Sequence, residues 1–201
     1  HDQGGQQQPD AEGVGTVDAL GERRSRGVLA EVTGGVANAA DLDAIEDELA
    51  RDRQVSRDDN GVLHSVDDMG FAIAFQVTVR KAYSAPDDLT NAAGHAPQRP
   101  LNQPGITLEM KATPRTLSHV VYFVPDAAKA EAFYAERLGF RTTDTFIGAG
   151  PFMRPAGSDD HHCLFMIQTP PHMKGCEHFT FHMGSGTEVL LAGTRFEQKG
   201  W

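Results

Sequence analysis

Two histidines stand at matching places in two segments of similar pattern, and they are the strongest chemical signal in the chain. His119 lies in the apolar run LSHVVYFV, and His178 lies in the run EHFTFHM. Each run is followed by a polar turn and an amphipathic helical stretch. Because side chains alternate faces along a strand, two equivalent strands paired in one curved sheet can aim both imidazoles at one point. The pattern therefore predicts a metal ion shared by His119 and His178.

The composition excludes several classes of function. The 201 residues carry 18 Lys and Arg against 28 Asp and Glu, a net charge of −10, and they contain no basic cluster that could neutralise phosphates. We therefore expect no nucleic-acid partner. No run reaches the roughly 18 apolar residues of a membrane span, and the N-terminus lacks the charged-then-apolar order of a signal peptide. We expect a cytoplasmic protein without a membrane partner.

The elements that must position the histidines begin after an N-terminal arm. Residues 1–26 are rich in Gly, Gln and charge without a sustained period, so we expect a loose arm there. The segment VLAEV at 28–32 then predicts a strand, and residues 37–55 predict a helix. Its apolar residues recur at spacings of three and four on one face: Leu42, Ile45 and Leu49. Two further strands are expected over residues 61–68 and 71–79.

A second module begins at Leu117, after an extended linker that is dense in Pro, Asn and Ala. Its first strand leads into a helix that Asp126 caps and Gly139 ends. Three strands complete it, over residues 140–147, 150–155 and 161–168. A third unit opens with a strand at Cys176 and stops after a helix. The apolar face of that helix is expected to comprise Val189, Ala192 and Phe196.

The predicted fold is α+β, with paired β-α-β-β-β modules that form curved, cup-shaped mixed sheets. The expected organisation is an arm at 1–26, an N-terminal module at 27–80, a linker at 81–116 and a C-terminal metal-binding domain at 117–201. That domain is divided into a module at 117–170 and a truncated module at 176–201.

The segments LSHVVYFVPD, AEAFYAERLGF, FMRPAGSDDHHCLF and EHFTF resemble the vicinal oxygen chelate superfamily, which unites glyoxalases, bleomycin resistance proteins and extradiol dioxygenases. Within it, they are most similar to the type I extradiol ring-cleaving dioxygenases. The resemblance covers roughly residues 28–201 and is strong from Leu117 onward. The phrase FYAERLGF is typical of the whole superfamily, whereas HH before a strand with EHFTF after it is more specific for the dioxygenases.

The resemblance implies an enzyme that opens a catechol-type ring with O2 and Fe(II), or Mn(II) in some members. By position, His119 and His178 match its two histidine ligands, and a glutamate ligand is expected from a strand beyond Trp201. His162 matches the family's histidine beside the metal, which would move protons during the reaction, although it could instead cap a strand together with His161. The expected partners are a small aromatic diol and O2, and a homo-oligomer is expected.

An aromatic substrate requires flat apolar contacts around a few polar anchors. We assign substrate binding to Phe152, Phe179 and His182, and further candidates for pocket walls are Phe146, Met153 and Phe181. Two carboxylates are not expected to bind the metal. Glu188 suits the positive end of a helix dipole, and Glu177 should point away from His178 because side chains alternate along a strand.

Two other functions fit the same scaffold. A glyoxalase-like metal-dependent isomerase or lyase would require a carboxylate ligand near the end of the second module's strands, and the segment HHCLFMIQ contains none. A non-catalytic protein that binds a small molecule would need no metal. Two histidines at ligand positions count against that reading, whereas the glutamate ligand expected outside this sequence keeps it open.

Overall fold

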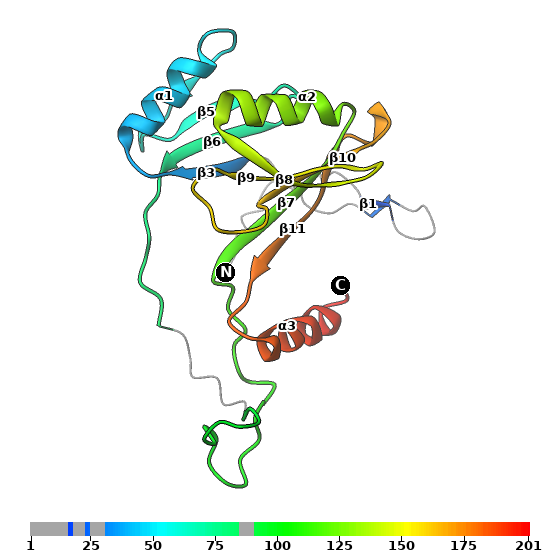
Figure 1. Ribbon diagram of the computed structural model, residues 1–201. Helices are drawn as coiled ribbons and strands as arrows, with labels where there is room; N and C mark the ends of the chain where they lie inside the picture. Colours follow the sequence, from blue (N-terminus) through cyan, green and yellow to red (C-terminus); the bar gives the residue numbers. More distant parts are fainter. Residues whose placement is uncertain (1–15, 18–22, 25–30, 85–90) are drawn as a thin grey trace, which may run out of the picture. The chain divides into compact units, whose positions relative to one another are not determined.

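The computed structural model describes residues 16–17, 23–24, 31–84 and 91–201 (Figure 1). The chain divides into two compact units. The first unit comprises residues 1–79 and 120–178, and the second comprises residues 80–119 and 179–201. The predicted α+β class with curved mixed sheets is confirmed. The predicted domain boundaries stay a prediction.

The N-terminal segment contributes one short ribbon, in which β1 (Thr16–Val17) pairs antiparallel with β2 (Arg23–Arg24). The rest of the predicted arm at 1–26 lies outside the described residues. Within the described ranges, no helix is long and apolar enough to cross a membrane.

A four-stranded sheet in the first unit has the order β3, β6, β5, β4. Its strands are β3 (Val32–Val36), β4 (Ser56–Arg57), β5 (Leu63–Val66) and β6 (Ala72–Val77). β3 runs parallel to β6, and the other neighbours are antiparallel. The strand predicted at 28–32 was placed too early, because β3 begins at Val32, where the prediction ended. Residues 28–30 lie outside the described part of the chain.

Two glycines explain why the sequence pattern did not predict a strand at the position of β3. Gly34 and Gly35 suggest a turn, yet both are paired with β6. A side chain at Gly34 would place its Cβ only 3.1 Å from the ring of Phe75, so glycine allows the two strands to pack closely. Pairing with β6 and the packing of Val32 and Val36 against the core outweigh the low strand propensity of glycine.

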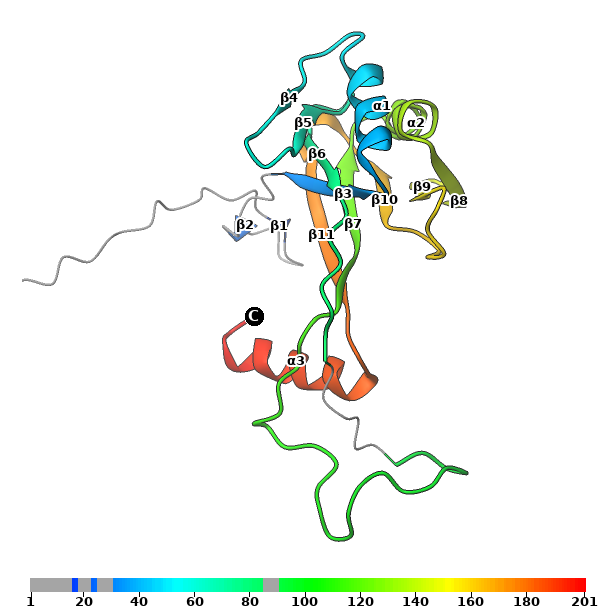
Figure 2. The same cartoon turned by 90° about the vertical axis from the view of Figure 1, so that its left-hand side faces the viewer.

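Helix α1 (Ala39–Leu49) packs on β3, β5 and β6 and lies beside the helix of the second module (Figure 2). Asn38 caps it, because its Oδ1 accepts a hydrogen bond of 3.0 Å from the Asp41 amide. Leu42 and Leu49 are buried and Ile45 packs against the same core, which confirms the predicted apolar face. The helix ends earlier than the predicted residue 55.

A five-stranded sheet has the order β11, β7, β10, β9, β8. Its strands are β7 (Thr116–Val124), β8 (Phe140–Phe146), β9 (Gly150–Pro155), β10 (Leu164–Gln168) and β11 (Gly175–His182). β10 runs parallel to β7 and antiparallel to β9, which is antiparallel to β8. The predicted order of strand, helix and three strands is therefore confirmed for this module. A short 3-10 helix, η2 (Pro171–Met173), precedes β11.

The helix of this module has the predicted start and end. α2 (Ala127–Ala132) begins after Asp126, whose Oδ1 accepts a hydrogen bond of 2.9 Å from the Lys129 amide. It continues as a π-helical segment, η1 (Phe133–Arg137). Gly139 follows with a φ of +68°, a conformation that glycine adopts without steric cost.

Both modules of the first unit bury side chains in one hydrophobic core. Leu49 and Leu63 come from the N-terminal module, and Val124, Met153 and Met166 come from the second; all five are fully buried. Core residues recur at alternate positions along β9 and β10, as expected for strands with one buried face.

One buried carboxylate links the modules at the edge of this core. Asp67 Oδ1 accepts hydrogen bonds from the amides of Met69 (2.9 Å) and Phe71 (2.8 Å), and its Oδ2 accepts one of 3.0 Å from the Tyr134 hydroxyl. Burial raises the pKa of Asp67, and the hydrogen bonds that it accepts oppose that rise. Burial also raises the pKa of Tyr134, which keeps its hydroxyl a donor.

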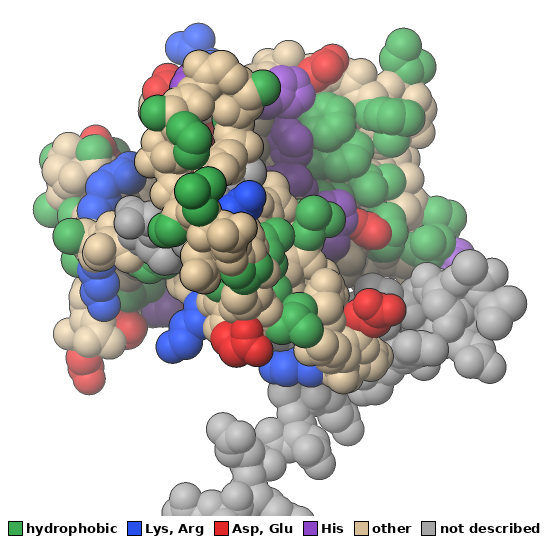
Figure 3. Space-filling view, turned by 90° about the horizontal axis from the view of Figure 1, so that it is seen from below, with side chains coloured by type: hydrophobic (Ala, Val, Ile, Leu, Met, Phe, Trp, Pro, Cys, Tyr) green, Lys and Arg blue, Asp and Glu red, His purple; other side chains and the backbone are tan. Residues whose placement is uncertain are grey.

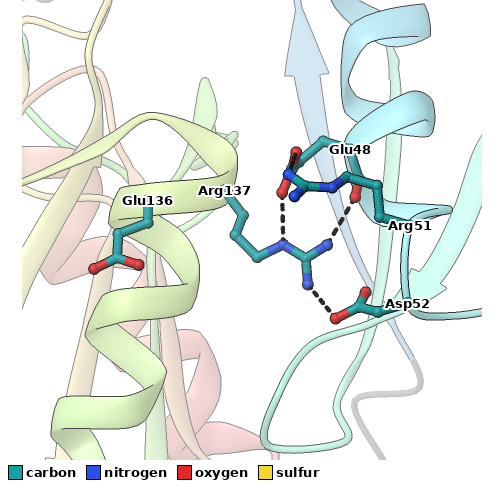
Figure 4. Close-up of a pocket in the computed structure, with 5 residues that line it drawn as sticks. All are labelled: Glu48, Arg51, Asp52, Glu136 and Arg137. Atoms are coloured by element: carbon teal, nitrogen blue, oxygen red, sulfur yellow. Dashed lines mark hydrogen bonds and ion pairs between the residues drawn. The ribbon is translucent and has the colours of Figure 1, made fainter.

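Arg137 forms a second link, on the surface between η1 and α1 (Figure 4). Its guanidinium donates to the Glu48 carboxylate at 2.9 Å, to the Glu48 carbonyl at 2.7 Å and to Asp52 at 2.8 Å. Hydrogen bonds from Arg53 and Arg137 lower the pKa of Asp52 to about 2. Together with Arg51 and Glu136, these side chains line a pocket, but none of the predicted metal ligands does. The charged residues that line this pocket therefore include those that form the ion pairs between η1 and α1.

In the second unit, α3 (Gly186–Gln198) starts with reciprocal capping bonds. Ser185 Oγ accepts from the Glu188 amide at 3.3 Å, and Glu188 Oε2 accepts from the Gly184 amide at 2.8 Å. The other oxygen of Glu188 accepts from Arg115 at 2.9 Å. Glu188 thus has the helix-start role that its position predicted.

The buried face of α3 differs from the predicted one. Glu188 and Leu191 are its buried residues, whereas Val189 and Phe196 are 54% and 60% exposed. Val189, Ala192 and Phe196 share a helical face, as predicted, but this face is not the buried one. The ion pair with Arg115 turns the Glu188 side of the helix inward, and no hydrophobic stripe decides the orientation.

Removing the Tyr134 hydroxyl should destabilise the protein, because it leaves Asp67 Oδ2 buried without that donor. Tyr134→Phe is expected to lower the free energy of unfolding by about 1–3 kcal/mol in urea titrations. Tyr83→Phe removes a hydroxyl from a half-exposed ring and should change that free energy by less than about 0.5 kcal/mol. Equal stability of Tyr134→Phe and the parent protein would contradict a structural role for the Asp67–Tyr134 bond.

Candidate active site

His119 lies on β7 and belongs to the second unit. Its side chain is half-buried, and its Nδ1 is 3.1 Å from the hydroxyl oxygen of Thr180 on β11. A hydrogen bond at one ring nitrogen fixes both the orientation of an imidazole and its tautomer. The contact with Thr180 therefore orients the His119 ring through Nδ1.

His178 lies on β11 and belongs to the first unit. Its Nδ1 contacts the carboxylate of Glu177, so the expectation that Glu177 points away from His178 is wrong. Regular alternation does not keep neighbouring side chains apart when a long, flexible side chain such as glutamate folds back. Burial lowers the pKa of His178, which favours the neutral imidazole that a metal binds.

β7 and β11 are neighbours in the five-stranded sheet, as the matching sequence positions require. The convergence of His119 and His178 on one metal stays a prediction. In the described part of the chain, no group of three or more His, Cys, Asp or Glu side chains could hold a metal ion. The third ligand expected beyond Trp201 is likewise still a prediction.

His162 lies immediately before β10, next to His161. The Nδ1 atoms of the two histidines are 3.0 Å apart, and the ring centroid of His162 is 4.8 Å from that of Phe152. Burial lowers the pKa of His162, and the charges of His161 and His178 lower it further. His178 therefore lies near enough to His162 for its charge to affect the His162 pKa.

An aromatic stack adjoins His162. The ring of Phe152 on β9 stacks on that of Phe165 on β10, with centroids 4.1 Å apart and planes inclined by 14°. Figure 3 shows histidine side chains next to hydrophobic side chains on one face of the molecule. The stacked ring of Phe165 and the nearby ring of His162 suit the predicted substrate contact of Phe152. Phe165 was not predicted, although its register opposite Phe152 follows once β9 and β10 are paired.

The other predicted substrate contacts and pocket walls differ in their exposure and in their neighbours. Phe179 and Phe181 on β11 are each 49% exposed, and their rings meet edge to face. His182 Nδ1 is 2.9 Å from the Thr116 hydroxyl. Phe146 is exposed at the end of β8, whereas Met153 is fully buried in the core. Met153 is therefore wrong as a pocket wall.

Each of the two predicted metal ligands contacts a side chain of its own unit. Each proposed ligand has a protein partner at Nδ1, Thr180 for His119 and Glu177 for His178, as is usual for histidines that bind metals. Sequence reasoning missed both partners, although each lies within two residues of His178. Neutral imidazoles suit iron and manganese as well as other first-row metals.

Comparison with known proteins gives a match in this part of the chain. Residues 116–201 match the model of the Glyoxalase/Bleomycin resistance protein/Dioxygenase superfamily. Metapyrocatechase 2 of Cupriavidus necator is 28% identical over 91 residues, which are 45% of this chain and 28% of that protein.

Two solved structures share the fold. The halotolerant catechol dioxygenase BphC has a TM-score of 0.60 at 20% identity, covering 85% of this chain and 56% of BphC. The Mn(II)-bound glyoxalase from Novosphingobium aromaticivorans has a TM-score of 0.60 at 19% identity, covering 89% of this chain and 54% of that one. This chain thus spans little more than half the length of either structure. Residues 116–201 are therefore similar to the Glyoxalase/Bleomycin resistance protein/Dioxygenase superfamily, the resemblance that the motifs indicated.

Proposed function

We propose that the protein is an extradiol ring-cleaving dioxygenase that opens a catechol-type ring with Fe(II) and O2. The observation that carries this proposal is the pair of histidines at equivalent positions on adjacent strands, each with a partner at Nδ1. Both lie in the segment that matches the superfamily. The similarity to Metapyrocatechase 2 and to a catechol dioxygenase structure supports the choice of reaction.

In this proposal, His119 and His178 would supply two ligands, and a carboxylate expected beyond Trp201 would supply the third. Fe(II), or Mn(II), bound by such a set would supply a binding point for the catechol oxygens and for O2. Thr180 and Glu177 hold the two imidazoles in orientation. An imidazole that is already held in orientation does not have to become ordered when it binds the metal.

His162 moves protons beside the metal. A lowered pKa makes its imidazole neutral near pH 7, so its Nε2 can accept a proton from a catechol hydroxyl and later return it. His161 and Phe152 both contact the His162 ring. The proposed substrate contacts are Phe152, Phe179 and His182.

Replacement of a ligand should remove the metal. His119→Ala is expected to bind Fe(II) at least about 100-fold more weakly than the parent protein, because even the loss of a ligand's hydrogen-bond partner costs about 10–100-fold. His95→Ala changes an exposed histidine and should leave metal binding unchanged. Iron per subunit after reconstitution and desalting gives the answer, and wild-type iron content in His119→Ala would refute its assignment as a ligand.

Loss of the proton-transfer group should separate metal binding from turnover. His162→Phe is expected to keep its iron and to lower kcat by about 10²–10⁴-fold, measured as catechol-dependent O2 uptake. Iron loss as complete as in His119→Ala would make His162 a ligand, and full turnover would make it a structural histidine. A glyoxalase-like isomerase or lyase consumes no O2, so the same assay separates that reaction from the proposed one.

A further inference from the structure

Strand β8 contains a β-bulge beside the proposed site. Its pairing with β9 shifts register between Thr142, which lies opposite Met153, and Asp144, which lies opposite Phe152. Thr143 is the extra residue between them. Bulges re-aim side chains and are common next to active sites.

The bulge directs the Thr143 hydroxyl toward two backbone carbonyls. Its Oγ1 lies 2.7 Å from the His161 carbonyl oxygen and 3.2 Å from that of Phe152. The shorter contact is a good hydrogen bond that the hydroxyl donates. One side chain therefore connects β8 both to β9 and to the segment that precedes β10.

The two carbonyls belong to the residues whose rings surround His162. The Phe152 ring lies 4.8 Å from it, and His161 Nδ1 lies 3.0 Å from its Nδ1. Asp144, which follows the bulge, places its carboxylate 4.0 Å from His161 Nε2. On the other side, the Cys163 amide donates to the Met153 carbonyl at 3.0 Å. The backbone around His162 is thus held from β8 before it and from β9 after it.

We propose that Thr143 is a positioning residue for His162, acting through the His161 backbone. The catalytic consequence rests on the proposed function, whereas the positioning itself does not. Without the hydroxyl, the His161 peptide loses its bond to β8, and the His161 and His162 rings sample more orientations. A proton-transfer group that is misplaced by a fraction of its hydrogen-bond length transfers protons more slowly.

The neighbouring threonine provides a matched control. The Thr142 hydroxyl contacts the Glu131 carboxylate on α2 and does not contact His161. Thr142→Val and Thr143→Val therefore remove the same group from adjacent residues of one strand. If Thr143 served only the stability of the sheet, the two substitutions would have similar effects.

The test compares histidine ring signals in NMR spectra of the metal-free protein. Thr143→Val should shift and broaden the His161 and His162 signals but not those of His64. Thr143→Ser, which keeps the hydroxyl, should restore them, and Thr142→Val should leave them at the wild-type positions. Unchanged His162 signals in Thr143→Val, or no restoration by Thr143→Ser, would overturn the proposal.

Kinetics of the iron-loaded protein separate this proposal from the proposed function. Thr143→Val should lower kcat about five- to tenfold with KM changed less than about twofold, a loss that matches one hydrogen bond. An unchanged kcat with shifted ring signals would overturn the catalytic consequence. The predicted NMR pattern in a protein that cleaves no catechol in any variant would support the positioning and contradict the dioxygenase.

Discussion

The two modules of the first unit bury a single hydrophobic core, and the other features of this unit depend on that constraint. Leu49 and Leu63 from the N-terminal module belong to the same buried cluster as residues of β7, β9 and β10. Neither module could bury these side chains alone, since each supplies one sheet face. The polar links lie at the edge of this core, where Asp67 is buried but fully hydrogen-bonded and Arg137 is ion-paired near the surface. These polar links make the packing of the two modules more specific, whereas the burial of apolar side chains drives it.

The same core determines which side chains remain for chemistry. Because Met153 and Met166 must face inward, alternation turns Phe152 and Phe165 to the opposite face of β9 and β10. That face is next to His162, so the aromatic environment of the proposed proton-transfer group follows from the packing of methionines on the other side. The bulge in the neighbouring strand β8, at Thr143, anchors the backbone of the histidine pair.

Local signals in the sequence predicted much of this fold. The cap at Asp126 and the left-handed Gly139 depend on a few neighbouring residues, and the order of strands and helices follows from periodicity. Features that depend on distant partners were not predictable. The inward face of α3 is set by the pairing of Glu188 with Arg115, which is far away in sequence. Likewise, the bulge at Thr143 is defined by how β8 pairs with β9. The sequence of β8 alone does not specify that register.

The central hypothesis is that His119 and His178 bind one iron ion. Anomalous diffraction at the iron absorption edge, measured on crystals of the Fe(II)-loaded protein, tests it most directly. The hypothesis predicts one strong peak with Nε2 of His119 and Nε2 of His178 both at about 2.0–2.3 Å. A peak bound by only one of these imidazoles, or located away from both, would contradict it.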